Sequence, residues 1–138
     1  MLQKLSTALG LVLISSGTVL ADKNATTEPS KLDIVMEKYE RTGEMKTCIN
    51  PRRIRSMKFV DEKHIIFKVS GKTSYLNELP RRCHNMDFYE SISYQVRGST
   101  ICSKEIFHVL DRTPIPGPFC SFGKFEKIVK KPKPEANG

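Results

Sequence analysis

Four cysteines, at positions 48, 83, 102 and 120, constrain this 138-residue chain more than any other feature. No two of them form the Cys-x-x-Cys pair that zinc sites commonly use, so we expect neither a metal nor a cofactor. In an exported domain an even number of cysteines is typical of a disulfide framework. Four cysteines allow three pairings. We favour Cys83 with Cys102, which closes a short loop around one strand, and Cys48 with Cys120, which ties the start of the domain to its last strand.

The N-terminus supports export, because residues 1–21 have the three parts of a signal peptide. Lys4 supplies the positive charge, and Ala8 to Ile14 form an apolar run that is too short to span a bilayer. Val19-Leu20-Ala21 places small residues at the expected cleavage site after Ala21. We therefore expect a periplasmic or secreted protein that keeps no transmembrane anchor after cleavage.

Residues 22–45 are expected to form a polar linker followed by one short helix over 31–41. Ser30 and Asp33 have the spacing of a capping box. Gly43 is suited to end the helix. The helix would present one apolar face, formed by Leu32, Val35, Met36 and Tyr39.

Residues 46–129 form a β-rich disulfide domain in this interpretation, and residues 130–138 a disordered basic tail. Apolar residues recur with period two in several short runs, and turns of about three residues join the first three runs into an antiparallel meander. The runs begin near Met57, Ile65, Tyr75, Ile92, Ile106 and Phe119. We predict five to six antiparallel strands over residues 54–128, closed or nearly closed as a small barrel or curled sheet. The proline-rich segment 113–118 is expected to be an extended loop.

The order of these features resembles a family of small exported four-cysteine bacterial proteins catalogued as a domain of unknown function. The matching features are Cys48, Ile54-Arg55, Asp61, the run 65–69, Tyr75-Leu76-Asn77-Glu78-Leu79, Cys83, Cys102 and Cys120. They cover about residues 46–128. Many relatives carry Gly-Asp after the third cysteine, where this chain has Ser103-Lys104-Glu105. The resemblance implies export and a small β-rich fold, and it implies no activity.

The chain is basic, with a formal net charge of +8. Its arginines gather at two places, and basic residues also cluster along Lys124 to Lys133. An anionic envelope lipid, lipopolysaccharide or an acidic protein is therefore the expected partner. The first group lies before the first strand of the meander and the second after its third strand, so they form two separate patches unless the sheet curls and merges them. The candidate anion-binding residues are Arg52, Arg53, Arg55, Arg81 and Arg82.

No catalytic constellation is visible, so the interpretation is a non-enzymatic binding or structural module. His64, His84 and His108 are scattered, without the spacing of a metal or nucleophile motif. An enzyme of unrecognised type is one alternative. Another is an inhibitor or accessory protein of an extracytoplasmic enzyme, because residues 70–75 are similar to the Ser-Gly loop of small exported lysozyme inhibitors. Lysozymes are usually cationic, however, and would repel so basic a chain.

Overall fold

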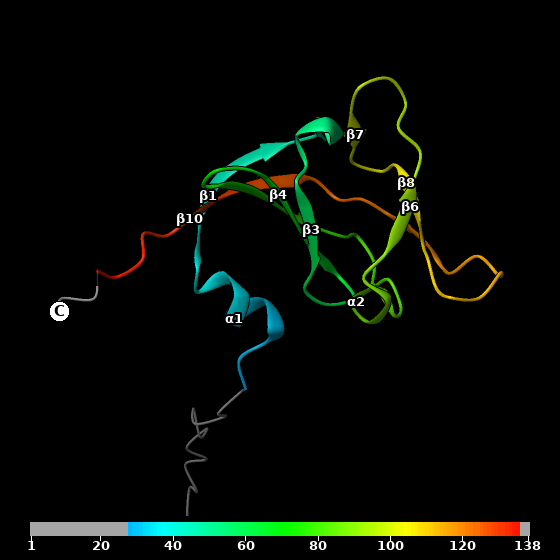
Figure 1. Cartoon of the computed structure of the whole chain (residues 1–138), viewed down its shortest axis with the longest axis horizontal. Coiled ribbons are helices and arrows are strands. Elements are labelled where there is room, and N and C mark those ends of the chain that lie inside the picture. The colour runs from blue at the N-terminus through cyan, green and yellow to red at the C-terminus, as the bar shows by residue number, and fades with distance from the viewer. Residues whose placement is uncertain (1–27, 136–138) are drawn as a thin grey trace, which may run out of the picture.

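The structure is a computed structural model that describes residues 28–135. The predicted signal peptide, over residues 1–21, lies outside the described residues. The described chain is mainly β, as predicted, and its strands alternate with short loops (Figure 1). In chain order the elements are α1 (Lys31–Met36), β1 (Tyr39–Lys46), β2 (Cys48–Ile49), the 3-10 turn η1 (Pro51–Arg53), β3 (Ser56–Phe59), β4 (His64–Ser70), β5 (Thr73–Glu78), α2 (Met86–Tyr89), β6 (Ile92–Tyr94), β7 (Ile101–Cys102), β8 (Ile106–Val109), β9 (Phe119–Ser121) and β10 (Phe125–Lys130).

The strands form three antiparallel sheets rather than one. The large sheet has five strands in the order β1-β10-β5-β4-β3, a small sheet pairs β2 with β7, and a third has the order β6-β8-β9. The expected barrel is therefore wrong for the described chain. Strands β1 and β3 remain edges of the large sheet, and strands of two or three residues, such as β2, β7 and β9, are too short to bridge them.

The predicted meander is confirmed as β3-β4-β5, the centre of the large sheet. Phe59 lies opposite Ile65 across the first turn, and Ser70 lies opposite Thr73 across the second. Gly71 has a φ of +49° in that second turn, a conformation that favours glycine. Successive side chains along these strands point to opposite faces of the sheet, and apolar residues on both sides give the large sheet two apolar faces.

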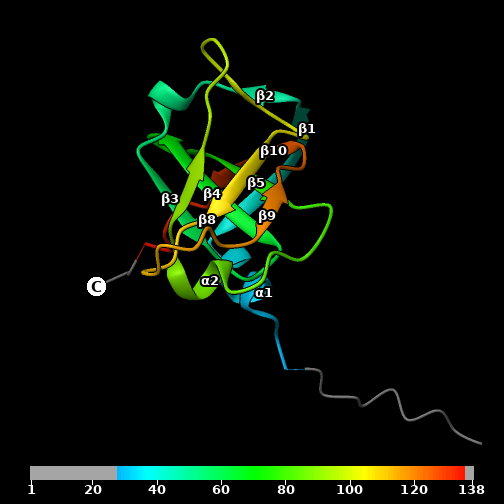
Figure 2. The ribbon, with the colours of Figure 1, turned by 90° about the vertical axis from the view of Figure 1, so that its right-hand side faces the viewer.

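Each face of the large sheet packs against a different part of the chain. One face meets the β6-β8-β9 sheet through a core that contains Phe67, Phe107, Phe122 and Phe125. The other face carries Ile66, Leu76 and Ile128, which pack against the apolar side of α1. Figure 1 shows α1 and the strands β6 and β8 on different sides of the large sheet, and Figure 2 looks at the molecule from the side of β8 and β9.

The helix is shorter than expected, and residues 39–46 form β1 in its place. Ser30 caps α1 through a capping box with Asp33, as predicted, but the helix ends at Met36 rather than at residue 41. Pairing with β10, which places Tyr39 opposite Lys130, gives residues 39–46 backbone hydrogen bonds along the sheet. The chain therefore joins the large sheet before residue 46, and β10 extends the sheet to Lys130, the first residue of the expected tail.

Two disulfides are present, but the favoured pairing was wrong. Cys48 is bonded to Cys102, and Cys83 to Cys120. Cys48 and Cys102 lie directly opposite each other in the β2–β7 pair, so the register brings their side chains together. Cys83 reaches β9 because its N–H donates to the carbonyl of Glu62, which holds the 79–85 segment against the β3–β4 turn.

Candidate functional site

A basic groove lies on the helix side of the large sheet, at the β4–β5 turn. Its cavity volume is about 320 Å³. Four cationic side chains line it, and no carboxylate does: the cations are Arg55, Lys68, Lys72 and Lys130. Four residues with hydroxyl side chains also line it: Ser56, Ser70, Thr73 and Ser74. This combination of point charges and hydroxyl donors suits an anion.

The strand register assembles the groove. Ser56 lies opposite Lys68, and Lys68 lies opposite Ser74, so these side chains share one row on the helix side. The N–H of Arg55 donates to the carbonyl of Lys68 at 2.7 Å. This hydrogen bond continues the pairing with β4 to the residue just before β3 and holds Arg55 beside Lys68. The N–H of Lys130 donates to the carbonyl of Lys72 at 2.9 Å, which ties the β4–β5 turn to the end of β10.

The groove is open because α1 is too short to cover it. A helix of six residues is ~9 Å long, whereas the seven residues of β4 span ~23 Å. The helix packs over Ile66, Leu76 and Ile128 and leaves the Lys68 end of the strands uncovered. The length difference therefore leaves one end of this sheet face in contact with solvent.

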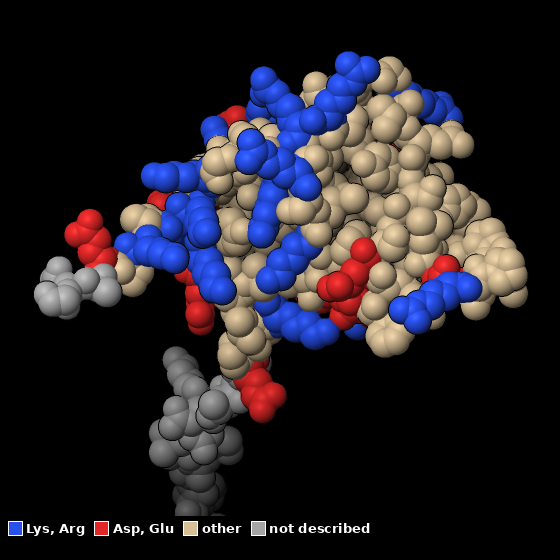
Figure 3. Space-filling view, viewed as in Figure 1, with Lys and Arg blue, Asp and Glu red and all other residues tan. Residues whose placement is uncertain are grey.

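The groove cations have no acidic partners among the described residues. Other cations of the described chain do: Lys31 pairs with Asp87, and Arg41 pairs with Glu126 at 3.0 Å. Figure 3 shows Lys and Arg side chains gathered over α1 and the large sheet, and a broad uncharged region over the part where Figure 1 places β6 and β8. Four cations that repel one another in a small hollow create a positive potential that a bound anion would relieve.

The structure separates the five arginines that the sequence singled out. Arg55 lines the groove. Arg52 and Arg53 lie in η1, at the same end of the meander, and are exposed outside the groove. Arg81 and Arg82 lie at the opposite end, where the Arg82 guanidinium donates to Glu62 at 2.8 Å in the β3–β4 turn. The five therefore do not form one merged patch.

Two groove residues, Lys68 and Lys72, were missed by the sequence analysis, and Lys130 was noted only as part of the basic stretch 124–133. Lys68 and Lys72 have a local signal, because the alternation along β4 and the turn at Gly71 place both at the Arg55 end of the meander. Lys130 lies in the basic stretch 124–133, but its place in the groove depends on the long-range pairing of β10 with β5 and β1. The arginines were selected because they cluster in sequence, whereas the groove cations come from segments that lie far apart in sequence.

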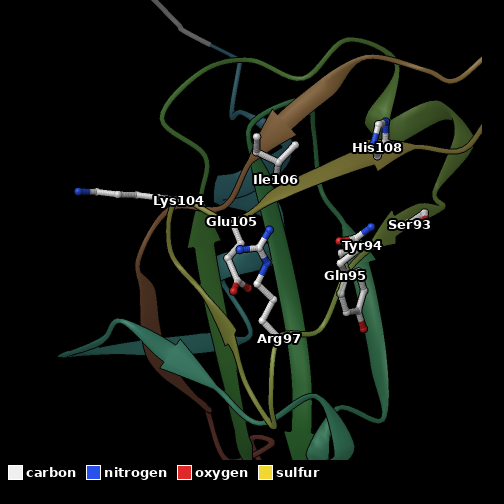
Figure 4. A pocket seen from close by; sticks show the side chains of 8 residues that line it. All are labelled: Ser93, Tyr94, Gln95, Arg97, Lys104, Glu105, Ile106 and His108. Carbon is white, nitrogen blue, oxygen red and sulfur yellow. The ribbon is translucent and has the colours of Figure 1, made fainter.

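A larger hollow of about 540 Å³ lies between β6, β8 and the 95–104 hairpin (Figure 4). Its lining carries both signs of charge: Arg97 and Lys104 against Glu105. In Figure 4 the Arg97 and Glu105 side chains point toward each other. The Glu105 carboxylate also accepts a hydrogen bond from the N–H of Cys102 at 2.8 Å. A carboxylate in the lining makes this hollow less suited to an anion than the basic groove.

The histidines lie apart from one another. His64 Nδ1 is 2.9 Å from both carboxylate oxygens of Asp61, and His84 Nδ1 is 3.6 Å from Glu62. His108 packs on Phe119, with 4.1 Å between the ring centroids. Over residues 28–135, no group of three or more His, Cys, Asp or Glu side chains is arranged to hold a metal ion.

A scan against protein-family models found no match, and searches of curated proteins and of solved structures found none either. The resemblance to exported four-cysteine bacterial proteins stays a prediction. Across the described residues, no helix is long and apolar enough to cross a bilayer.

Proposed function

We propose that this protein is a non-enzymatic binding module that holds a phosphate-bearing envelope component in the basic groove. The observation that carries the proposal is the gathering of Arg55, Lys68, Lys72 and Lys130 around one hollow without a carboxylate in its lining. The planar guanidinium of Arg55 suits two oxygens of a phosphate at once, and the lysines add point charges around it. Lipid headgroups and lipopolysaccharide share this chemistry.

The proposal places the protein outside the cytoplasm, in the periplasm or the medium. The disulfides Cys48–Cys102 and Cys83–Cys120 support this, because disulfides persist in oxidising compartments. The signal-peptide pattern of residues 1–21 supports it independently. Anionic lipids and lipopolysaccharide are accessible to a protein exported in this way.

The test is binding of the oxidised protein to vesicles of anionic phospholipid, with neutral phosphatidylcholine vesicles as the reference, at low and high salt. The groove variant combines Arg55→Ser, Lys68→Ser and Lys72→Ser. A basic residue near an anionic surface contributes about 1 kcal/mol, so the triple variant should bind roughly 100-fold more weakly. High salt should weaken wild-type binding, because surface attractions are screened over ~8 Å at physiological ionic strength.

The matched control combines Arg52→Ser, Arg53→Ser and Arg81→Ser, which removes the same charge from exposed positions outside the groove. We expect this control to retain most of the binding. An equal loss in both variants would mean that net charge alone attracts the protein to the vesicle. That result, or no wild-type binding at low salt, would contradict the proposal. Salt-sensitive capture of an acidic protein without vesicle binding would point to the protein alternative.

A further inference from the structure

The four cations of the basic groove form two pairs, each held by a backbone hydrogen bond. In the first pair the N–H of Arg55 donates to the carbonyl of Lys68 at 2.7 Å. In the second pair the N–H of Lys130 donates to the carbonyl of Lys72 at 2.9 Å. All four side chains line the same hollow of about 320 Å³. The backbone therefore anchors the positive charge of the groove at two places.

One strand separates the two pairs. Lys68 is on β4 and Lys130 is on β10, and β5 lies between these strands. Lys68 lies opposite Ser74 of β5, and Ser74 lies opposite Ile128 of β10, so Lys130 is two residues farther along the sheet. Neighbouring strands are ~4.8 Å apart and each residue adds ~3.4 Å, so the Cα atoms of Lys68 and Lys130 are ~12 Å apart. This spacing is much wider than a single phosphate group.

The part of β5 between the pairs carries hydroxyl groups and no charge. Thr73 and Ser74 begin this strand, and both line the groove. Ser74 is 5% exposed, so it belongs to the floor of the groove. Tyr39 lies opposite Lys130 and also lines the hollow, where it adds a phenol hydroxyl and the apolar surface of its ring. Hydroxyl groups beside a ring surface suit a polar, uncharged linker such as a sugar ring.

We infer that the ligand of the groove carries two phosphoryl groups on one sugar-sized core, with one phosphate at each pair of cations. This inference rests on the proposed function and names the ligand class of the same site. Four cations drawn onto one phosphate would have to approach one another against their mutual repulsion. With two linked phosphates each pair keeps its own anion, and the second contact forms within a complex already made.

Lipopolysaccharide carries phosphates on a sugar core, whereas a phosphatidylglycerol headgroup has a single phosphodiester. Of the envelope components that the proposed function allows, lipopolysaccharide therefore fits the two pairs better. A soluble sugar bisphosphate shares the same chemistry, and vesicles separate the two sources, as described below.

Isothermal titration calorimetry of the oxidised protein at low salt tests the inference with three probes. Glucose 1,6-bisphosphate has phosphates at opposite ends of one sugar ring, pyrophosphate has two without a linker, and glucose 6-phosphate has one. We expect the bisphosphate to bind at least about tenfold more tightly than either of the others, because two linked charge-assisted contacts reinforce each other. A bisphosphate that binds no more tightly than the others would overturn the inference and leave the groove an anion site. No binding of any probe would contradict the proposed function as well.

Two double variants each remove one pair: Arg55→Ser with Lys68→Ser, and Lys72→Ser with Lys130→Ser. All four positions are exposed, so both variants should fold. Each should reduce the preference for the bisphosphate over glucose 6-phosphate to less than about threefold, because only one phosphate keeps its cations. The matched control is Arg52→Ser with Arg81→Ser, which removes the same charge from exposed positions outside the groove. A double variant that keeps the full preference, or a control that loses it equally, would overturn the inference.

Vesicles identify the source of the two phosphates. At equal phosphate content, vesicles that contain lipopolysaccharide should bind the protein more tightly than phosphatidylglycerol vesicles. The Arg55→Ser, Lys68→Ser variant should lose this difference. Equal binding of the wild type to both kinds of vesicle would contradict lipopolysaccharide as the source.

Discussion

Asn77 and Gly123 are joined by a reciprocal pair of hydrogen bonds. The Asn77 side-chain amide donates to the Gly123 carbonyl at 2.8 Å, and the Gly123 N–H donates to the Asn77 side-chain oxygen at 2.9 Å. Asn77 is fully buried near the end of β5, opposite Ile65 on one side and Phe125 on the other. This pair fixes the place where the chain leaves β9 and enters the large sheet as β10.

Asn77→Ala should reduce the free energy of unfolding by about 2–4 kcal/mol, because both backbone groups of Gly123 lose their partner in a partly buried setting. Urea denaturation followed by circular dichroism measures the loss. Gln95→Ala is the control, since Gln95 is exposed, and it should change stability by no more than ~0.5 kcal/mol. A loss below about 1 kcal/mol for Asn77→Ala would show that the pair is not a structural anchor.

Gly123→Ala should also destabilise the fold, for a steric reason. A Cβ at this position would lie 1.8 Å from the carbonyl oxygen of Glu78, a backbone atom that cannot rotate away. We expect a lowered urea midpoint and reduced yield of folded protein. Gly98→Ala is the comparison, because the space around Gly98 is open and only its φ of +75° disfavours alanine. A Gly123→Ala midpoint above that of Gly98→Ala would contradict the assigned packing.

Each disulfide should stabilise the protein by about 3–4 kcal/mol, because the bridges span 54 and 37 residues and restrict long loops in the unfolded chain. We expect Cys48→Ala with Cys102→Ala, and Cys83→Ala with Cys120→Ala, each to lower the urea midpoint. Peptide mapping without reduction checks the pairing first. A peptide that links Cys83 to Cys102 would contradict the structure.

Glu62 should make the stability of the β3–β4 turn depend on pH. The N–H of Asn85 donates to its carboxylate, and this hydrogen bond, followed by that from Arg82, lowers the pKa of Glu62 below its ordinary value of 4.5. A lowered pKa in the folded state stabilises the fold at pH values above 4.5, and that stabilisation is lost as the pH falls through the folded-state pKa.

The melting temperatures of wild type and Glu62→Gln, compared from pH 7 to pH 3, test this dependence. The difference should be largest at neutral pH and should disappear in acid. Glu40→Gln serves as the control, because Glu40 is exposed and forms no ion pair within the described chain. A wild-type advantage over Glu62→Gln that stays constant across the range would refute the assignment.

The meander was predictable because its signals are local. Ile65, Phe67 and Val69 alternate with exposed or oppositely directed residues, and short polar turns separate the strands. Strand β1 gave no such signal: seven of its eight residues are exposed, so the sheet holds them through backbone pairing and not through an apolar pattern. Tyr39 fitted the expected helix as well as it fits the strand. Gly43, expected to end that helix, instead has a φ of +74° in the irregular middle of β1.

Neither the disulfide pairing nor the position of the groove could be predicted from the sequence, and the reason is the same for both. Cys48 meets Cys102 through the register of two very short strands, and nothing near either cysteine in sequence encodes that contact. Lys130 reaches Lys72 only because β10 crosses to the centre of the large sheet. Sequence patterns indicated the charge of the molecule, and the long-range topology decided which charges stand together.

The central claim is that the basic groove is the anion site, and an NMR titration of the ¹⁵N-labelled protein with pyrophosphate tests it most directly. The account predicts saturable shifts of backbone amide signals concentrated at Arg55, Lys68, the 71–74 turn and Lys130, with little change at Arg81 and Arg82. Small, non-saturating shifts spread over all exposed lysines and arginines, or shifts centred on Arg81 and Arg82, would contradict it.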